Sequence, residues 1–422
     1  MAILIHDYAG HPFQVGLSRE LARRGIDVIH AFAGGLLTPR GCLERQPGDP
    51  DGLRFVEVPM HPDYRRDKYN FRKRRGYEVA YGDTLRRLIE RERPALVISG
   101  NTPSEPQLTA VRAASRLGIP FISWVQDFYS VAVHKLVSKR SIVLGWLAGA
   151  YYSRIDRRCL QRSAHVVTIS EDFMPLLRRH GISPEAVSVV ENWGALEEMP
   201  LRPKANAWAR AHGLLDRRVL MYTGTLAMKH NPQRLRELAV RYRRQPDVKI
   251  LVISEGPSAE ALMRCAEMER LSNLVVMPFQ AFADMPDVLA SADVLLALLE
   301  PDAGVFSVPS KILSYLCAGR PTVAAMPTAN LGGRLLTRVG AGLVVDPDDR
   351  DGWLASVDRL LEDPRLRAEM GRAARAHAER TFDIPRIADR FEHVFARAMQ
   401  ARPQAARGPA VALGELRTRT NG

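Results

Sequence analysis

The chain has 422 residues and a mass of 47.1 kDa, a length that predicts two or three domains. Hydrophobic residues make up 46% and charged residues 25% of the chain, which excludes a wholly disordered, collagen-like or fibrous protein. Sixty Lys and Arg against 47 Asp and Glu give a net charge of +13, which favours anionic partners. This excess is divided between both halves of the chain, so it does not form a nucleic-acid-binding tail, and we expect no nucleic-acid partner.

The four cysteines lie far apart and form neither a C-x-x-C pair nor a metal-ligand set with histidine. This usage fits a reducing compartment, and we expect neither a metal nor a cofactor. The first residues lack a basic segment followed by a long apolar one, so we expect an opening strand, no signal peptide and a cytoplasmic protein. The longest apolar segment, Ser141 to Tyr152, is too short for a membrane span and predicts a buried or interfacial helix.

Strands and helices alternate along the first half, the pattern of a parallel sheet covered by helices. Strands are expected over residues 2–6, 27–33, 95–99, 119–125 and 165–170. Helices are expected over residues 14–24 and 79–93, from 106, over a stretch that reaches 162, and over 170–181. The following stretch, 193–215, carries prolines and charges without strand character and predicts an inter-domain linker.

The alternation starts again after this linker. Strands are expected over residues 219–223, 249–254, 273–277, 293–298 and 322–325, with helices from about 233, 258, 284 and 309. We therefore predict an α/β protein with two Rossmann-like, doubly wound parallel-sheet domains that face a cleft. The predicted units are residues 1–195, 196–383, a terminal helix over 384–400 and a disordered tail over 401–422.

The stretch from Phe306 to Ala325 carries the strongest chemical signal. Pro309 fits a first helical position, and Ser310 brings a hydroxyl to the first turn. Lys311 lies in the same turn, where the helix macrodipole disfavours a cation unless an anion binds there. Free N–H groups, a hydroxyl and a lysine together indicate a phosphate or diphosphate site. A surface lysine on an ordinary capped helix is the alternative.

Two further loops follow strands of the second domain. In the first, Gly224 permits close backbone approach to a ligand, and Lys229 stands where the loop enters the next helix. Lys229 and Lys311 are then expected to point into one cleft, although a solvated loop lysine is an equal alternative. The second loop, with Glu255 and Gly256 before Pro257, is a weaker signal.

The first domain offers two candidate sites of its own. His11 and Gln14 follow the first strand, in a turn that lacks the full G-x-G-x-x-G of dinucleotide-binding proteins. They are expected to face the cleft or to cap the turn. Gln126 and Asp127 stand at a strand end, where a carboxylate can orient a sugar hydroxyl or move a proton. A helix cap or an arginine partner is the structural alternative for Asp127.

A basic run, residues 64–75, has seven basic side chains, one acidic and three aromatic. Lys135, Lys139 and Arg140 form a second basic cluster before the apolar segment that begins at Ser141. Regions 65–75 and 135–152 together are typical of a peripheral protein on an anionic membrane surface. A solvated charged face is the alternative for the basic run.

Taken together, these motifs resemble those of GT-B glycosyltransferases of the large retaining family 4, in the branch with bacterial colanic-acid and O-antigen transferases. The resemblance covers the chain from the first strand to about Arg397. The motifs are G-H-P-x-Q after the first strand, Q-D at 126–127, E-N-W at 191–193, G-T-L-x-x-K at 224–229, S-E-G-P at 254–257, and P-S-K followed by A-G-R-P.

The resemblance implies a nucleotide-sugar donor held by the second domain and a glycan or polyprenyl-linked acceptor held by the first. Lys229 and Asp127 take the catalytic roles. The terminal helix is expected to cross back onto the first domain. The expected substrate-binding residues are Gly10, His11, Gln14, Gln126, Gly224, Thr225, Glu255, Gly256, Phe279, Ser310, Lys311 and Ser314.

Three departures from the family pattern affect the expected chemistry. The paired glutamates of the family correspond to Phe306 and Ser314, an arginine corresponds to Thr225, and a histidine corresponds to Gln126. We expect a retaining, metal-independent transferase that acts in polysaccharide synthesis and is either free in the cytoplasm or bound at the inner face of the plasma membrane. A non-catalytic scaffold, a nucleotide-sugar epimerase and, least favoured, a nucleic-acid-binding protein are the alternatives.

Overall fold

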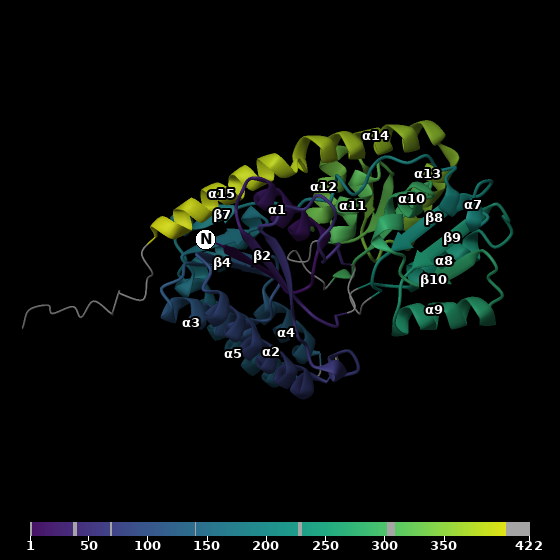
Figure 1. Ribbon diagram of the computed structural model, residues 1–422. Coiled ribbons are helices and arrows are strands. Elements are labelled where there is room, and N and C mark those ends of the chain that lie inside the picture. The colour runs from purple at the N-terminus through teal and green to yellow at the C-terminus, as the bar shows by residue number, and fades with distance from the viewer. Residues whose placement is uncertain are drawn as a thin grey trace, which may run out of the picture.

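The computed structural model describes residues 2–36, 40–67, 70–139, 141–226, 230–301 and 309–401, which form two α/β lobes (Figure 1). The strands are β1 (Ile3–Asp7), β2 (Val28–Ala33), β3 (Leu53–Val58), β4 (Leu96–Gly100), β5 (Phe121–Val125), β6 (His165–Thr168), β7 (Val187–Val189), β8 (Arg218–Thr223), β9 (Val248–Ile253), β10 (Leu274–Met277), β11 (Val294–Leu298), β12 (Thr322–Ala325) and β13 (Gly342–Val345). The α-helices are α1 (Pro12–Arg23), α2 (Phe71–Glu92), α3 (Ser104–Arg116), α4 (Tyr129–Ser138), α5 (Ile142–Arg162), α6 (Met174–Arg179), α7 (Ala207–Ala211), α8 (Gln233–Arg241), α9 (Pro257–Met268), α10 (Met285–Ala290), α11 (Ser310–Cys317), α12 (Leu331–Val339), α13 (Arg350–Glu362), α14 (Pro364–Thr381) and α15 (Ile384–Gln400).

Both sheets are parallel and doubly wound, which confirms the predicted fold class. The first sheet has the order β3-β2-β1-β4-β5-β6-β7, and the second has the order β10-β9-β8-β11-β12-β13. The chain therefore reverses its direction of winding between β1 and β4 and again between β8 and β11. A doubly wound sheet leaves a crevice at this point, because the loops after the two strands turn to opposite faces. In each lobe the strand order therefore predicts a ligand site at this crevice.

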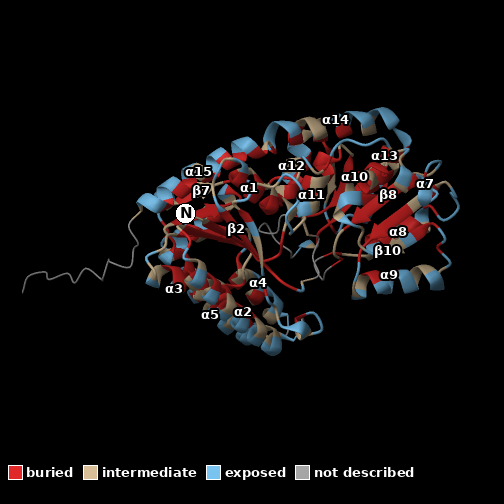
Figure 2. Ribbon diagram, viewed as in Figure 1, coloured by how far each residue is buried: buried red, intermediate tan, exposed pale blue. Residues whose placement is uncertain are grey.

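The strands are apolar because helices cover the sheets on both faces. Figure 2 shows burial concentrated in the strands and in the inner faces of the helices. Helices α1 and α15 pack together on one face of the first sheet, while α2, α3, α4 and α5 form a contiguous group on the other. Among the described residues, no helix is long and apolar enough to cross a bilayer.

The terminal helix α15 lies against the first lobe, although it follows the second lobe in the chain (Figure 1). Phe391 is fully buried there, with its ring centroid 4.8 Å from that of Trp124 and 5.9 Å from that of Trp193. Arg24, the residue that caps the C-terminus of α1, donates hydrogen bonds to Asp389 (2.6 Å) and Glu392 (2.7 Å). Aromatic packing and a partly exposed ion-pair cluster therefore join α15 to the first lobe.

Several elements differ from the expectation. The second helix begins at Phe71, so part of the basic run is helical, and the stretch before 162 is a hairpin of two helices, α4 and α5. Three strands were not expected: β3 and β7, the two edges of the first sheet, and β13, one edge of the second. The partial exposure of β3 and the short lengths of β7 and β13 weaken their apolar signal. The predicted tail lies outside the described residues beyond 401.

Candidate active site

The crevice of the second lobe brings Gly224 and Lys311 together. Gly224 directly follows β8 with φ +105°, a conformation that side chains rarely adopt. A Cβ atom on Gly224 would lie 3.5 Å from Cε and Nζ of Lys311. The Lys311 Nζ also lies 3.5 Å from the centre of the Tyr222 ring, within range of a cation–π interaction. The ammonium group is therefore held beside the Gly224 backbone at the end of β8.

Tyr315 fixes the geometry of this crevice. Its buried hydroxyl accepts a hydrogen bond from the Thr223 N–H (3.1 Å) and donates one to the Leu296 carbonyl (3.2 Å). One side chain of α11 is thus bonded to both strands that border the crevice. Burial raises the pKa of Tyr315 to about 12, so the hydroxyl keeps its proton and remains a donor at neutral pH.

A cavity of about 700 Å³ lies between the two lobes, and its walls contain several predicted residues. The second lobe contributes Thr225, Glu255, Gly256 and Phe279 to these walls. Glu255 accepts a hydrogen bond from the Phe279 N–H (3.0 Å), which joins the loops after β9 and β10. The first lobe closes the cavity with Tyr8, Ala9, Leu36, Tyr64 and Arg65. The volume and the mixed lining suit a nucleotide-sized ligand.

A second cavity of about 320 Å³ occupies the crevice of the first lobe. Gln126 and Asp127 line it, as predicted from their position after β5. The Gln126 Oε1 accepts a hydrogen bond from Asn192 (3.1 Å), and Asp127 accepts one from the Phe128 N–H (2.8 Å). Asp127 is exposed at the mouth of this cavity, where its carboxylate can accept a hydrogen bond from a ligand hydroxyl.

The turn after β1 is organised around Asp7, a fully buried carboxylate. Asp7 accepts hydrogen bonds from the backbone N–H groups of Ala9 and His11 and from the His11 ring (3.3 Å). Burial acts to raise the pKa of Asp7, but the interactions with His11 outweigh it and leave the pKa below its usual value. Gln14 is 0% exposed, with its amide against the Asp7 carboxylate, and lines neither cavity. The expectation that Gln14 faces the cleft is therefore corrected to a structural role.

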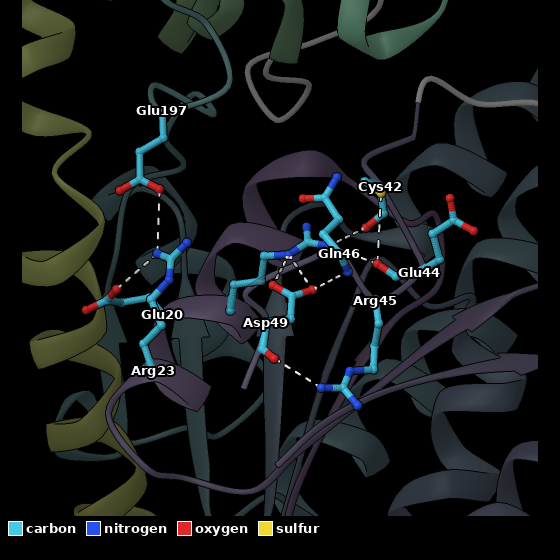
Figure 3. A network of polar contacts seen from close by, with 9 residues as sticks. Glu20, Arg23, Cys42, Glu44, Arg45, Gln46, Asp49 and Glu197 are labelled. Carbon is cyan, nitrogen blue, oxygen red and sulfur yellow. Dashed lines mark hydrogen bonds and ion pairs between the residues drawn. The ribbon is translucent and has the colours of Figure 1, made fainter. Parts of the chain in front are cut away.

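Gly10 in the same turn lies under a loop of the first lobe. A Cβ atom on Gly10 would lie 2.7 Å from Cδ1 of Leu43. The Gly10 carbonyl accepts a hydrogen bond from the Gly41 N–H (3.0 Å). Figure 3 shows the polar network that holds this loop to α1. In that network Arg19 donates to Asp49 (3.0 Å) and to the Glu44 carbonyl (3.0 Å). The loop thereby fixes the backbone of the turn that borders the inter-lobe cavity.

Tyr8 lines both cavities and forms the wall between them. Its hydroxyl donates to Tyr64 (3.3 Å), and Tyr64 donates to the buried carboxylate of Glu78 (3.1 Å). Glu78 also accepts hydrogen bonds from Arg74 (2.8 Å) and Tyr129 (3.3 Å). The cluster ties α2 and α4 to the end of β1, so the partition is braced by hydrogen bonds on the side of the first lobe.

Sequence reasoning missed Asp7, Tyr8, Glu78 and Asn101 at this site. Asp7 gave one signal, because it is an acidic residue that ends an otherwise apolar strand. Asn101 follows β4 with φ +55° and hydrogen-bonds to the His11 ring (3.2 Å). This left-handed conformation, which asparagine tolerates better than most residues, has no marker in a single sequence.

The remaining predicted residues lie in α11 or outside the described residues. Ser310 and Ser314 lie in α11, one turn apart, with Ser310 exposed. Lys229 and Phe306 lie outside the described residues. Within the described ranges, no group of three or more His, Cys, Asp or Glu side chains is arranged to hold a metal ion.

Comparison with protein families assigns both lobes. Residues 12–193 match the model of the glycosyl transferase 4-like domain, and residues 217–363 match that of glycosyl transferases group 1. The chain thus carries two glycosyltransferase domains, one in each lobe. The first match covers most of the seven-stranded lobe. The second contains the whole six-stranded sheet and ends before α14 and α15.

Curated relatives of this chain are distant in sequence. The putative colanic acid biosynthesis glycosyl transferase WcaI of Escherichia coli is 24% identical over 56% of this chain and 58% of its own length. The D-inositol 3-phosphate glycosyltransferase of Saccharomonospora viridis is 28% identical over 56% of each chain. The probable glycosyltransferase WbjE of Pseudomonas aeruginosa is 22% identical over 63% of this chain and 66% of its own length. The chain thus spans less than two thirds of the length of each.

Solved structures resemble this chain along almost its whole length. The Anabaena protein HepE, in complex with UDP and glucose, superposes with a TM-score of 0.69 at 15% identity, over 94% of this chain and 99% of its own. WaaG, a glycosyltransferase involved in lipopolysaccharide biosynthesis, superposes with a TM-score of 0.64 at 13% identity, over 93% and 99%. At these identities the likeness establishes the fold alone.

A Gly224→Ala change is expected to weaken binding of an anionic ligand about tenfold. The added methyl group strains the backbone at φ +105° and stands 3.5 Å from the Lys311 ammonium. Nucleotide affinity measured by calorimetry checks this result. Gly340→Ala is the matched control, because Gly340 has φ +70° with open space around it, far along the chain at the end of α12. Equal losses of affinity in the two variants would contradict the assignment.

Proposed function

We propose that the protein is a retaining, metal-independent glycosyltransferase that uses a nucleotide-diphosphate sugar, with UDP as the nucleotide. The acceptor is a lipid-linked or growing polysaccharide at the inner face of the plasma membrane. The observation that carries this proposal is the Lys311 ammonium held beside Gly224 in the crevice between β8 and β11. The UDP and glucose bound to the structural neighbour HepE support the choice of donor. The relative named for colanic acid biosynthesis supports a polysaccharide product.

The proposed reaction breaks the bond between the anomeric carbon and the diphosphate oxygen. The acceptor hydroxyl forms the new bond on the same face of the sugar, and its proton passes to the departing phosphate oxygen. Negative charge builds on the diphosphate as it leaves. Lys311 and the N-terminal N–H groups of α11 stabilise that charge more in the transition state than in the bound donor, which lowers the barrier. Lys229 is proposed as a second cation at the same group.

Asp127 and the first-lobe cavity are proposed to receive the acceptor. The exposed carboxylate at the cavity mouth suits a hydrogen bond from a sugar hydroxyl, and the neighbouring Gln126 offers an amide. Tyr8 would then lie between the donor and the acceptor, since it borders both cavities. His11, Glu255, Phe279 and Ser310 are proposed to line the donor side, together with Gly10, Thr225, Gly256 and Ser314.

Incubation of the purified protein with UDP- and GDP-sugars and glycan acceptors tests this proposal. We expect acceptor-dependent nucleotide release with a UDP-sugar, undiminished by EDTA, and NMR of the product should show the donor's anomeric configuration retained. Release dependent on added metal, or an inverted product, would overturn the corresponding part of the mechanism. Sugar isomerisation without an acceptor would instead identify an epimerase.

A non-catalytic scaffold is the second candidate, and one observation favours it. Ser314 stands in α11 at the position where the family carries a glutamate, and a serine hydroxyl is neither charged nor basic. This alternative predicts that the nucleotide binds, as calorimetry would show, without turnover under any of the donor and acceptor combinations.

A further inference from the structure

The helical hairpin α4–α5 carries a concentrated exposed apolar surface on the first lobe. We define the apolar tip as Leu136, Ile142, Val143, Leu144, Trp146, Leu147 and Tyr151. These seven are half of the fourteen large hydrophobic residues exposed in the described part of the chain. Ile142 is 79% exposed and Trp146 is 65% exposed. Scattered exposed hydrophobic residues are ordinary, but a cluster of this size marks an interaction surface.

Small residues inside the hairpin force these side chains outward. A Cβ atom on Gly145 would lie 2.7 Å from the Ser138 backbone, and one on Gly149 would lie 2.9 Å from Cβ of His134. The His134 ring also hydrogen-bonds to the Gly145 carbonyl (3.0 Å), which holds the two helices at this distance. Glycine therefore occupies the inner face of α5, while isoleucine, leucine and tryptophan occupy the outer face. A soluble hairpin has the reverse arrangement.

Basic side chains follow the apolar tip along the same helix. Arg154 and Arg158 come seven and eleven residues after Leu147, so the 3.6-residue period places them on its face of α5. Both are exposed. Arg75 of α2 adds a guanidinium beside the tip, since it donates to the Tyr151 hydroxyl (3.2 Å). Together α4 and α5 contain five Lys and Arg and one Asp.

We infer that the α4–α5 hairpin docks the protein on an anionic lipid bilayer, with the apolar tip inserted into the leaflet. Apolar side chains at the tip would enter the acyl-chain boundary, while Trp146 and Tyr151 suit the interfacial layer. Arg154 lies about 10 Å further along the helix from Leu147, a height that matches the phosphate groups of the lipids. A second copy of this chain fits less well, because self-association would bring these like charges together.

The same hairpin leads from the apolar tip to the proposed acceptor cavity. Tyr129 and Ala132 of α4, with Asp156 and Leu160 of α5, line that cavity. Ten residues of helix separate Trp146 from Asp156, a distance of about 15 Å. An acceptor whose lipid remains in the leaflet could therefore present its sugar at the cavity. This link rests on the proposed function, whereas bilayer docking by the apolar tip does not.

Vesicle flotation tests the docking without any sugar donor, so its failure is separable from failure of the proposed reaction. The full chain is mixed with vesicles of phosphatidylcholine alone or with about one third phosphatidylglycerol. We expect binding to the anionic vesicles, weak binding to the neutral ones and a blue shift of tryptophan emission. Trp146→Ser with Leu147→Ser should lower the bound fraction at least tenfold, and Arg154→Gln with Arg158→Gln should remove the preference for anionic lipid.

Met268→Ser with Met399→Ser is the matched control, because both methionines are exposed and lie on α9 and α15, outside the hairpin. This pair should bind vesicles as the parent does, and all variants should keep the parent's thermal midpoint, since the altered side chains are exposed. Parent-like vesicle binding by the tip variant would overturn the inference. An absence of binding to the anionic vesicles would also overturn it. If the parent were then a dimer in sedimentation velocity and the tip variant a monomer, the tip would be a contact between two copies of this chain.

Discussion

Replacement of Lys311 by alanine is expected to lower kcat for sugar transfer by about 10²–10³-fold. The estimate follows from removal of one donor that acts on transition-state charge, which costs about 2.7–4 kcal/mol in an enclosed site. Most of the loss should appear in kcat, because charge on the diphosphate grows as the glycosidic bond breaks. Steady-state nucleotide release with a saturating UDP-sugar gives the measurement.

Two comparisons make the Lys311→Ala result interpretable. Lys249→Ala is the matched control, since Lys249 is a lysine of the second lobe whose ammonium donates to the Ser272 carbonyl (3.0 Å) on the exposed surface. It should leave kcat within about twofold of the parent. The thermal midpoint of the Lys249→Ala variant should agree with the parent, and circular dichroism should show that the Lys311→Ala variant is folded, because the Lys311 ammonium is packed over the buried Tyr222 ring. A Lys311→Ala enzyme within threefold of parental turnover would remove this lysine from the mechanism.

Replacement of Phe391 by alanine is expected to lower the free energy of unfolding by about 3–5 kcal/mol. Phe391 is fully buried, and its ring packs against Trp124 and Trp193 where α15 crosses onto the first lobe. The truncation leaves a cavity between an element from the end of the chain and the core of its first half. Urea unfolding followed by tryptophan emission gives the measurement, since two of the reporting indoles line that cavity.

In the Phe391→Ala protein the first lobe should unfold at a lower urea concentration than the second. The single unfolding transition of the parent would then be replaced by two. Met399→Ala is the control, because Met399 lies on the same helix with an exposed side chain and should cost less than about 0.5 kcal/mol. If the Phe391→Ala protein matched this control, α15 would contribute little to the first lobe.

The Lys311→Ala and Phe391→Ala predictions concern different parts of the molecule. The position of the Lys311 ammonium depends on the order of strands in the second sheet, because β8 and β11 are neighbours and their carboxyl ends border one crevice. The position of α15 depends on aromatic contacts between segments more than 190 residues apart, such as Trp193 and Phe391. Loss of the first contact should leave a folded but slow enzyme, whereas loss of the second should leave an enzyme with the site intact and a weaker first lobe.

The sequence by itself determined the α/β alternation and the two parallel sheets, because buried strands and amphipathic helices have periods that a local window reveals. It also indicated Gly224 and Lys311, since each carries a local anomaly: a glycine at a strand end and a lysine in the first turn of a helix. Their convergence was predictable because parallel strands end at the same edge of a sheet. The edge strands β3 and β7 were missed because β3 is partly exposed and β7 has only three residues, so neither leaves a clear apolar pattern.

Only the tertiary structure decided which polar side chains face a cavity. Gln14 and Asp127 both follow strands in the sequence, yet Gln14 lies in α1 against the buried Asp7 carboxylate while Asp127 is exposed and lines a cavity. The apolar tip needed coordinates too. The sequence left this apolar segment as buried or interfacial, and the coordinates show that its large side chains are exposed while the glycines of α5 lie against α4 on the opposite face. Side-chain direction of this kind depends on partners distant in the sequence, so no local pattern could specify it.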